Sequence, residues 1–319
     1  MESNNQIKIS QNKIKNKTTL DQIVKVVFTL IALICASVIV VVVIFILFEG
    51  IKPFATTYLI NDKQYTVNFW NFLVGLSWEA KPYEYGVGFI IINTLYVTFL
   101  SLLIAIPISV LTSLFIVRIA PKKIGTVLNY IIELLASIPS IIYGVFGAGV
   151  ITQLVKNLAS LFHYQSAGGV STLATVLVLA IMIIPTITMI SITSIKAVKE
   201  DFIKGSLALG ASKTQTNFKV VLTSAKSGIF SGIILGVGRA LGEATAVTMV
   251  AGNANYGPTF NLFDITRTLT STMLANMQET SGLSYDIRFS VGVILIIIIL
   301  ITNLLLNFIK QKVGNNYAK

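Results

Sequence analysis

Charge, cysteine and histidine are all scarce in this sequence. Charged residues make up only 12% of the 319 residues, whereas hydrophobic residues make up 54%. This balance excludes an ordinary soluble domain. The single cysteine, Cys35, lies in an apolar run, so an internal disulfide is excluded. The single histidine, His163, has no second ligand residue nearby, and no metal site is predicted.

Nucleotide-binding and catalytic motifs are also missing. The sequence has no G-x-x-x-x-G-K-[ST] loop, so any nucleotide that drives this protein must be bound by another polypeptide. No nucleophile, base and orienting group recur together, so no catalytic residue is predicted and an enzyme is disfavoured. Gly236, Gly238 and Gly242 have the wrong spacing for G-x-G-x-x-G and follow no strand, which excludes a dinucleotide loop.

Long apolar runs are what the sequence has instead. Each is long enough to cross the hydrocarbon core of a bilayer, about 30 Å thick, as a helix. An all-α polytopic membrane protein with six transmembrane helices is therefore predicted. The first run is retained because no small-residue cleavage site follows it. The predicted spans cover about 24–48, 86–117, 126–155, 170–195, 228–252 and 289–309.

The segments between the spans assign the two sides of the membrane. Most of the 24 lysines and arginines lie on one side, which comprises residues 1–23, 118–125, 196–227 and 312–319. The positive-inside rule places these segments, and both termini, in the cytoplasm. The segments 49–85 and 253–288 are then external loops. This distribution explains the net charge of +11 without a nucleic-acid partner. The basic 1–23 tail is predicted to be disordered or interfacial.

The fifth span carries two charges near its midpoint, Arg239 and Glu243, in the run GRALGEATAVTMVAGN. An ionisable group inside the bilayer costs about 2.5–3.5 kcal/mol on insertion scales, so it normally faces a protein interior or a solute path. Small residues recur every four positions from Gly228 to Ala244, which favours close approach of a second helix. On a continuous helix, the i, i+4 spacing lets Arg239 and Glu243 contact each other. Two interpretations stay open: a structural ion pair or a substrate path.

The third span is interrupted by polar residues and a proline within ELLASIPSIIYGVFGAG. Polar groups and proline are tolerated at membrane depth where the backbone is buried by protein or faces water, so an interior helix is predicted. Ser137, Ser140 and Tyr143, together with Thr245 of the fifth span, are candidates for lining the path or for packing. Glu133 is expected either to be buried against a neighbouring helix or to face the path.

The 196–227 segment is too polar to cross a membrane. Apolar residues at roughly helical spacing on either side of Gly210 predict two short amphipathic helices, which would expose an apolar stripe to a cytoplasmic partner. A simple interfacial loop explains the same composition equally well.

Several stretches resemble one known family. The run SLALGASKTQTNFKVVL resembles the cytoplasmic coupling motif of ABC importer permeases. The runs ASIPSIIYGVFG (136–147), GRALGEATAVTMVAGN (238–253) and LFDITRTLTS (262–271) together resemble the PstC-type permease subunit of phosphate ABC importers. The similarity extends from about Asn93 to the end of the chain. It implies the type I, MetI-like permease fold for a core at 86–311.

The resemblance also implies roles and partners. Arg239 and Glu243 would lie on the phosphate path. Partners would be two copies of an ATP-binding subunit, which holds the ATP and Mg, a PstA-type second permease subunit and an external phosphate-binding protein. The chain itself is expected to bind no cofactor and to be a multi-pass protein of the cell membrane, surrounded by lipid. The residues expected to contact the ATP-binding subunit are Leu207, Ala208, Leu209, Gly210 and Ala211.

The chemistry of the two charges suggests a mechanism. A guanidinium group presents a planar fork of donors suited to phosphate and stays charged at working pH. Glu243 is expected to pair with Arg239 at rest and to accept a hydrogen bond from protonated phosphate, which would disfavour fully deprotonated sulfate. Three rival interpretations remain: an ABC permease for sulfate, molybdate or a polar organic solute; an ATP-independent secondary transporter or channel; and a non-transporting membrane scaffold or sensor.

Overall fold

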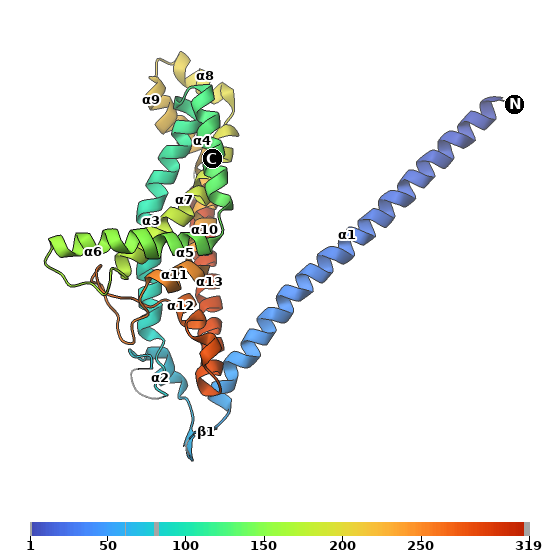
Figure 1. The fold of residues 1–319 in the computed structure, drawn as a ribbon. Helices are drawn as coiled ribbons and strands as arrows, with labels where there is room; N and C mark the ends of the chain where they lie inside the picture. Colours follow the sequence, from blue (N-terminus) through green and yellow to red (C-terminus); the bar gives the residue numbers. More distant parts are fainter. Residues whose placement is uncertain (1, 61, 80–82, 316–319) are drawn as a thin grey trace. The chain divides into compact units, whose positions relative to one another are not determined.

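The computed structural model describes residues 2–60, 62–79 and 83–315 (Figure 1). Within these residues, six helices are long and apolar enough to cross a membrane, which agrees with the six spans predicted from the sequence. They cover Asp21–Ala55, Gly88–Ile119, Ser140–Leu161, Thr172–Lys196, Lys213–Gly242 and Leu283–Lys312. The chain divides into two compact units, one ending at Glu49 and the other starting at Gly50.

The first unit is helical throughout its described length. It consists of helix α1, Glu2–Ala55, up to Glu49. The helix therefore includes the basic segment for which the sequence predicted a disordered or interfacial tail. Between Ile23 and Phe48, most apolar side chains are exposed, and they point in all directions around the helix axis. A helix that is apolar all round is typical of a membrane span.

The second unit is built around one buried helix. Its long helices are α3 (Gly88–Leu114), α7 (Thr172–Lys196), α10 (Leu222–Gly242) and α13 (Leu283–Asn315). Helix α7 packs against both α3 and α10. In the most apolar stretch of α7, 61% of the residues are buried inside the chain, against 33% for the spans that contain α3 and α10 and 17% for α13. The centre of the unit is therefore α7, and its surroundings decide which side chains point inward.

Short elements connect and cap these helices. A hairpin of β1 (Tyr58–Ile60) and β2 (Lys63–Tyr65) pairs Tyr58 with Tyr65. The short helices are α2 (Phe69–Val74), α8 (Glu200–Ala208), α9 (Lys213–Gln215), α11 (Thr245–Val250), α12 (Leu269–Leu274) and the 3-10 turn η4 (Met277–Glu279). Three π-helical segments are η1 (Phe115–Ile119), η2 (Gly147–Ile151) and η3 (Thr216–Val221).

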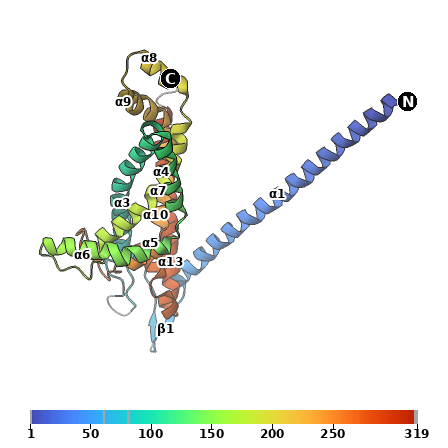
Figure 2. The ribbon, with the colours of Figure 1, turned by 45° about the horizontal axis from the view of Figure 1, so that its top comes forward.

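The region expected to form a continuous third span is broken into two helical segments. Helix α4 (Lys122–Ser137) ends before Ile138, and α5 (Ser140–Phe146) begins after Pro139 and continues through η2 into α6 (Thr152–Leu161). Figures 1 and 2 show α5 and α6 lying across the direction of the long helices. Pro139 accounts for the break, because the residue before a proline avoids the helical conformation. Ile138 accordingly has an extended backbone, with φ −65° and ψ 127°.

The fifth span is interrupted as well, although the sequence predicted a continuous helix there. Helix α10 ends at Gly242, Glu243 is extended with φ −76° and ψ 115°, and α11 starts at Thr245. Residues 253–288, predicted as an external loop, contain a helix, α12, whose residues Leu269 to Thr272 are buried. Helix α12 packs against α11 and α13. Part of the predicted loop thus belongs to the core of the unit.

Candidate functional site

The two helix breaks lie close together because α5 packs directly on α11. Gly144 makes this contact possible: a Cβ atom there would lie 2.9 Å from the Cα atom of Ala246 and 2.7 Å from the sulfur of Met249. Tyr143 and Val250 belong to the same buried cluster. Two interrupted helices therefore meet inside the unit. Non-helical backbone at membrane depth is tolerated where protein buries it or where it lines a water-filled space.

Arg239 lies in the last turn of α10, directly before the second helix break, and its side chain is half-buried. Its Nη1 atom donates a hydrogen bond to the Thr186 hydroxyl at 2.7 Å. Thr186 follows the proline in the middle of α7. In the part of the chain that the structure describes, no carboxylate pairs with Arg239. Its positive charge is held by a neutral hydroxyl group and is not neutralised.

Glu243 occupies the break itself. Its Oε1 atom accepts a hydrogen bond from the backbone N–H of Ala246 at 3.1 Å, so the carboxylate caps α11. The backbone carbonyl of Glu243, which the break frees, accepts a hydrogen bond from the Thr270 hydroxyl at 2.7 Å. The structure therefore does not form the expected ion pair between Arg239 and Glu243. The i, i+4 argument needs a continuous helix, and the helix ends between the two residues.

The structure separates the other predicted path residues into two groups. Tyr143 is buried, and its hydroxyl donates to the Leu135 carbonyl at 2.8 Å, which bridges the first helix break. Ser140 and Thr245 are half-buried at the first positions of α5 and α11. Ser137, by contrast, is exposed and its hydroxyl donates to the Leu134 carbonyl of its own helix.

Glu133 is exposed in this chain, so of the two expectations, burial against a neighbouring helix is not met within the chain. Its Oε1 atom accepts a hydrogen bond from the Asn129 amide at 2.5 Å. Both side chains belong to α4 and border a cavity of about 380 Å³ that Thr193 and Lys196 of α7 also line. The carboxylate is therefore open to whatever lies beyond this face of the chain.

Thr186 is the contact residue of Arg239 that sequence reasoning missed. The available signal was Pro185, because a proline inside a span leaves a backbone carbonyl of the preceding turn without its helical donor and marks a place where polar groups gather. Threonines are common in apolar spans, however, and only the packing of α10 on α7 shows that this one faces Arg239.

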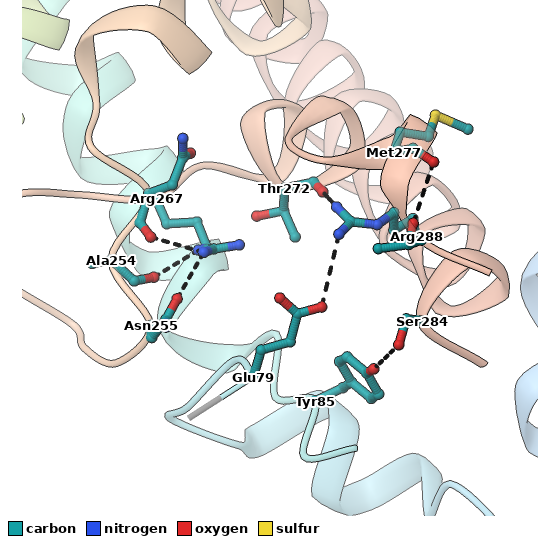
Figure 3. A network of polar contacts seen from close by, with 11 residues as sticks. Glu79, Tyr85, Ala254, Asn255, Arg267, Thr272, Met277, Ser284 and Arg288 are labelled. Atoms are coloured by element: carbon teal, nitrogen blue, oxygen red, sulfur yellow. Dashed lines mark hydrogen bonds and ion pairs between the residues drawn. The ribbon is translucent and has the colours of Figure 1, made fainter. Parts of the chain in front are cut away.

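A second polar network lies in the loops between α11 and α13 (Figure 3). Arg267 is 5% exposed and donates hydrogen bonds to the Ala254 carbonyl at 2.6 Å, the Asn253 carbonyl at 2.8 Å and the Asn255 side chain at 2.9 Å. Burial lowers the pKa of Arg267 to about 10, and the negative charge of Glu79 opposes this shift. The guanidinium group therefore stays charged at neutral pH and fixes the turn that follows α11.

Arg288 extends this network to α13. It is 2% exposed, donates to the Thr272 carbonyl at 2.5 Å and forms an ion pair with Glu79 at 3.7 Å. Figure 3 shows the Glu79 side chain directed toward Arg288, with Arg267 pointing into the same region. The network links residues near 79, 254, 267 and 288, which are far apart in the sequence. The sequence assigned these charges to external loops only, and nothing in their local pattern signals burial.

The 196–227 segment forms helices, as one of the two sequence interpretations predicted. Helix α8 ends at a turn in which Gly210 has φ +83°, and a second helical piece, α9 with η3, follows. A hydrogen bond of 3.0 Å between the hydroxyls of Ser206 and Thr216 ties the two pieces together. The turn presents Leu209, which is 91% exposed, at its tip. Of the predicted coupling residues, Leu207, Ala208, Leu209 and Gly210 are exposed and Ala211 is half-buried.

These features define the chain as a multi-pass helical membrane protein in which two interrupted helices meet at an uncompensated intramembrane cation. Interrupted helices around a charged site are characteristic of transporters. The protruding helix pair adds a surface that a soluble partner can contact.

Comparison with known proteins agrees with this class and makes it specific. Residues 91–316 match the family described as "Binding-protein-dependent transport system inner membrane component". The chain is 35% identical over 294 residues to a probable ABC transporter permease protein, YqgH, of Bacillus subtilis, with 90% of each chain covered. It is 34% identical over 262 residues to the phosphate transport system permease protein PstC of Pasteurella multocida, with 76% of this chain and 82% of the relative covered.

Solved structures support the fold. A chain of the inward-facing methionine ABC transporter MetNI matches with a TM-score of 0.54 at 19% identity, covering 72% of this chain and 94% of that chain. A chain of a bacterial alginate ABC transporter matches with the same TM-score at 17% identity, covering 70% and 78%. At this identity the likeness concerns the fold alone.

The chain therefore belongs to the family of binding-protein-dependent transport system inner membrane components. It is a multi-pass inner-membrane permease subunit of an ABC importer, and its fold is of the MetI type. In such transporters ATP is hydrolysed by a separate subunit, so this chain is not itself an enzyme and needs no cofactor of its own. ATP-binding subunits and an external binding protein complete complexes of this kind.

Proposed function

We propose that this chain is the PstC-type permease subunit of an ATP-driven phosphate importer, with both termini in the cytoplasm. A PstA-type second permease subunit, two copies of the ATP-binding subunit and an external phosphate-binding protein would complete the transporter. Two observations support phosphate as the solute. Relatives named as phosphate permeases cover most of the chain, and the charge left uncompensated in the membrane is an arginine.

The observation that carries the proposal is the position of Arg239. Its guanidinium group is half-buried at a helix break, is held by the Thr186 hydroxyl at 2.7 Å and is not paired with a carboxylate in the described residues. An unpaired cation in a low-dielectric region favours a visiting anion. The guanidinium presents a planar fork of donors that suits an oxyanion in two-point contact. A single such group also lets the ion leave again, as a transport site requires.

Glu243 acts in this proposal as a selectivity group. Its Oε1 atom is engaged by the Ala246 N–H, whereas Oε2 has no partner among the described residues. A negative oxygen beside the path repels an anion that carries no proton. It accepts a hydrogen bond from the O–H of protonated phosphate. Phosphate is thereby favoured over sulfate, which carries no proton at neutral pH.

The open side of α10 supports a contact with the second permease subunit at this surface. Gly238 and Gly242 lie in the last turns of α10, before and after Arg239 in the sequence, and a Cβ atom at either glycine would meet nothing within 4 Å. A helix of the second subunit can therefore approach this surface closely. The path then runs between the two permease subunits. The ATP-binding subunits act on the turn around Leu209, and a rigid-body movement alternates access to the path.

The test is uptake of labelled phosphate by vesicles that contain the complete transporter. Arg239→Gln removes the charge and is expected to abolish uptake while the complex still assembles, as judged by co-purification of its subunits. Arg239→Lys keeps a charge without the planar fork and is expected to retain partial uptake. Lys226→Gln, near the start of the same helix and remote from the break, serves as the matched control. Near-normal uptake with Arg239→Gln would overturn the proposal.

Competition by other ions tests the solute and the role of Glu243 separately. Unlabelled phosphate is expected to compete with labelled phosphate, whereas sulfate and molybdate are not. Glu243→Gln keeps an oxygen that can cap Ala246, so the helix break is preserved while the charge is lost. This variant is expected to admit sulfate as a competitor. Unchanged discrimination would show that Glu243 has no selectivity role, and uptake without ATP would indicate a secondary transporter.

A further inference from the structure

A cavity of about 530 Å³ lies where four elements of the second unit meet, at the C-terminal end of α7, and Arg239 does not line it. It is bordered by η1, by the start of α4, by the end of α7 and by the start of α8. Its floor is apolar, with Ile116, Ile195 and Ile203 buried. The cavity therefore joins the ends of two membrane helices to the first helix of the 196–227 segment.

The charges at the rim of this cavity are mainly positive. Arg118, Lys122 and Lys196 line it, against one carboxylate from Glu200. Arg118 is half-buried, and its Nε atom donates a weak hydrogen bond to the Asn217 side chain at 3.4 Å, which holds the guanidinium group at the cavity. Lys122 and Lys196 are exposed. Three cations around one recess attract an anion with several oxygen atoms.

The start of α4 adds backbone donors to the same recess. Its N-cap residue, Pro121, provides no side-chain cap, and its first turn contains no acidic residue. The first N–H groups of this 16-residue helix have no helical partner, and the helix dipole places partial positive charge there. The neighbouring helix α8 differs, because Glu200 and Asp201 lie in its first turn. Of these two helix starts, only that of α4 lacks a negative group.

Close packing fixes the start of α4 at the cavity. Gly125 is buried, and a Cβ atom there would lie 2.8 Å from the Ile116 carbonyl oxygen. The first turn of α4 is therefore held against η1, and Thr126 and Tyr130 continue the polar wall of the cavity along α4. The recess is shaped by backbone contacts and does not depend on mobile lysine side chains alone.

We propose that this cavity binds a phosphate group, contributed either by the headgroup of an anionic phospholipid or by inorganic phosphate. Basic recesses between membrane helices on the cytoplasmic side are suited to anionic lipid headgroups. The bound group would contact Arg118, Lys122 and the start of α4.

Two measurements on the purified, complete transporter distinguish the sources. Native mass spectrometry after exchange into mixed phosphatidylglycerol and phosphatidylcholine reports lipid retention. Equilibrium binding of labelled inorganic phosphate in discs of phosphatidylcholine alone, with the external binding protein omitted, reports the free ion. The variant Arg118→Gln/Lys122→Gln is expected to weaken whichever ligand binds by about tenfold or more, since it removes two charge-assisted contacts. Lys123→Gln/Lys199→Gln, which removes two nearby lysines that do not line the cavity, is the matched control.

The two arms give distinct outcomes. Selective retention of phosphatidylglycerol that the cavity variant loses and the control keeps assigns the site to lipid. Binding of inorganic phosphate with the same pattern assigns it to the free ion. Lys122→Gln alone is expected to show a smaller loss of ligand binding than the double variant. Because Lys122 is exposed, this single variant can be measured even if the double variant does not fold. Equal binding by the wild type, the cavity variants and the control in both arms overturns the proposal. A loss of uptake in Arg239→Gln with unchanged cavity binding would show that the two sites are separate.

Discussion

Replacing Thr186 by valine tests how the structure holds the intramembrane cation. Valine has nearly the shape of threonine but cannot accept the hydrogen bond that Arg239 donates at 2.7 Å. A hydrogen bond to a charged group contributes about 1.5–3 kcal/mol. Because both side chains are half-buried, we expect the lower end of this range. A loss of about 1.5 kcal/mol corresponds to a fall of about tenfold in the uptake rate at low phosphate.

The assay is the initial rate of labelled phosphate uptake, normalised to the amount of transporter in the membrane. Thr186→Ser keeps the hydroxyl group and is expected to retain most of the wild-type rate, which separates the hydrogen bond from packing. Arg239→Gln gives the lower limit of the uptake rate. If Thr186→Val transports at the wild-type rate while Arg239→Gln is inactive, the hydroxyl group does not position the guanidinium group and this reasoning is wrong.

Three further predictions concern stability. Gly144→Ala places a methyl group against Ala246, so we expect it to lower the free energy of unfolding by about 1–3 kcal/mol and to lower the Tm in detergent. Gly149→Ala is the control, because a Cβ atom there meets open space and the Tm should not change. Equal Tm values for the two variants would contradict the close packing of α5 on α11. Arg288→Met breaks the pair with Glu79 and is expected to cost about 3 kcal/mol, measured by the same unfolding assay, and an unchanged Tm would show that the network is not structural. Gly210→Ala forces an alanine into a backbone conformation with φ +83°, which costs about 1–2 kcal/mol of folding free energy. The rate of amide hydrogen exchange across the 200–221 helices should therefore rise about 5- to 30-fold. An unchanged exchange rate would contradict this account of the turn.

The sequence predicted the spans because their length and hydropathy are local properties. The helix pair around Gly210 was one of two interpretations that the sequence left open, because the glycine separates two stretches of helical periodicity but a simple interfacial loop has the same composition. The break at Ile138 had its own local signal in the proline that follows it, but the change of direction of α5 and α6 depends on packing against α11. The sequence therefore indicated where the helix of the third span is interrupted, but not the direction of the helical segment that follows.

The break at Glu243 had only Gly242 as a local signal, and this glycine also fitted the row of small residues along the span. The run from Gly238 to Val250 is rich in alanine and reads as a continuous helix. The extended residue is stabilised by a hydroxyl from Thr270, which is 27 positions further along the chain, and by capping of α11 by the Glu243 carboxylate. A pairwise argument from i, i+4 spacing predicted a contact with Arg239 that the break removes. The second polar network, in the loops between α11 and α13, could not be predicted for the same reason, since Glu79 and Arg288 are brought together only by the tertiary fold.

Cysteine labelling at the start of α11 tests the central claim most directly. Cys35 is the only cysteine of the chain, so Cys35→Ser leaves a background in which Thr245→Cys carries the single thiol of this subunit. Thr245 is half-buried beside the break that holds Arg239 and Glu243. In the complete transporter, phosphate is expected to slow the reaction of this thiol with a negatively charged methanethiosulfonate reagent, and the added change Arg239→Gln is expected to abolish that protection. Labelling that phosphate leaves unchanged in the presence of Arg239 would contradict a solute-binding cation at this position.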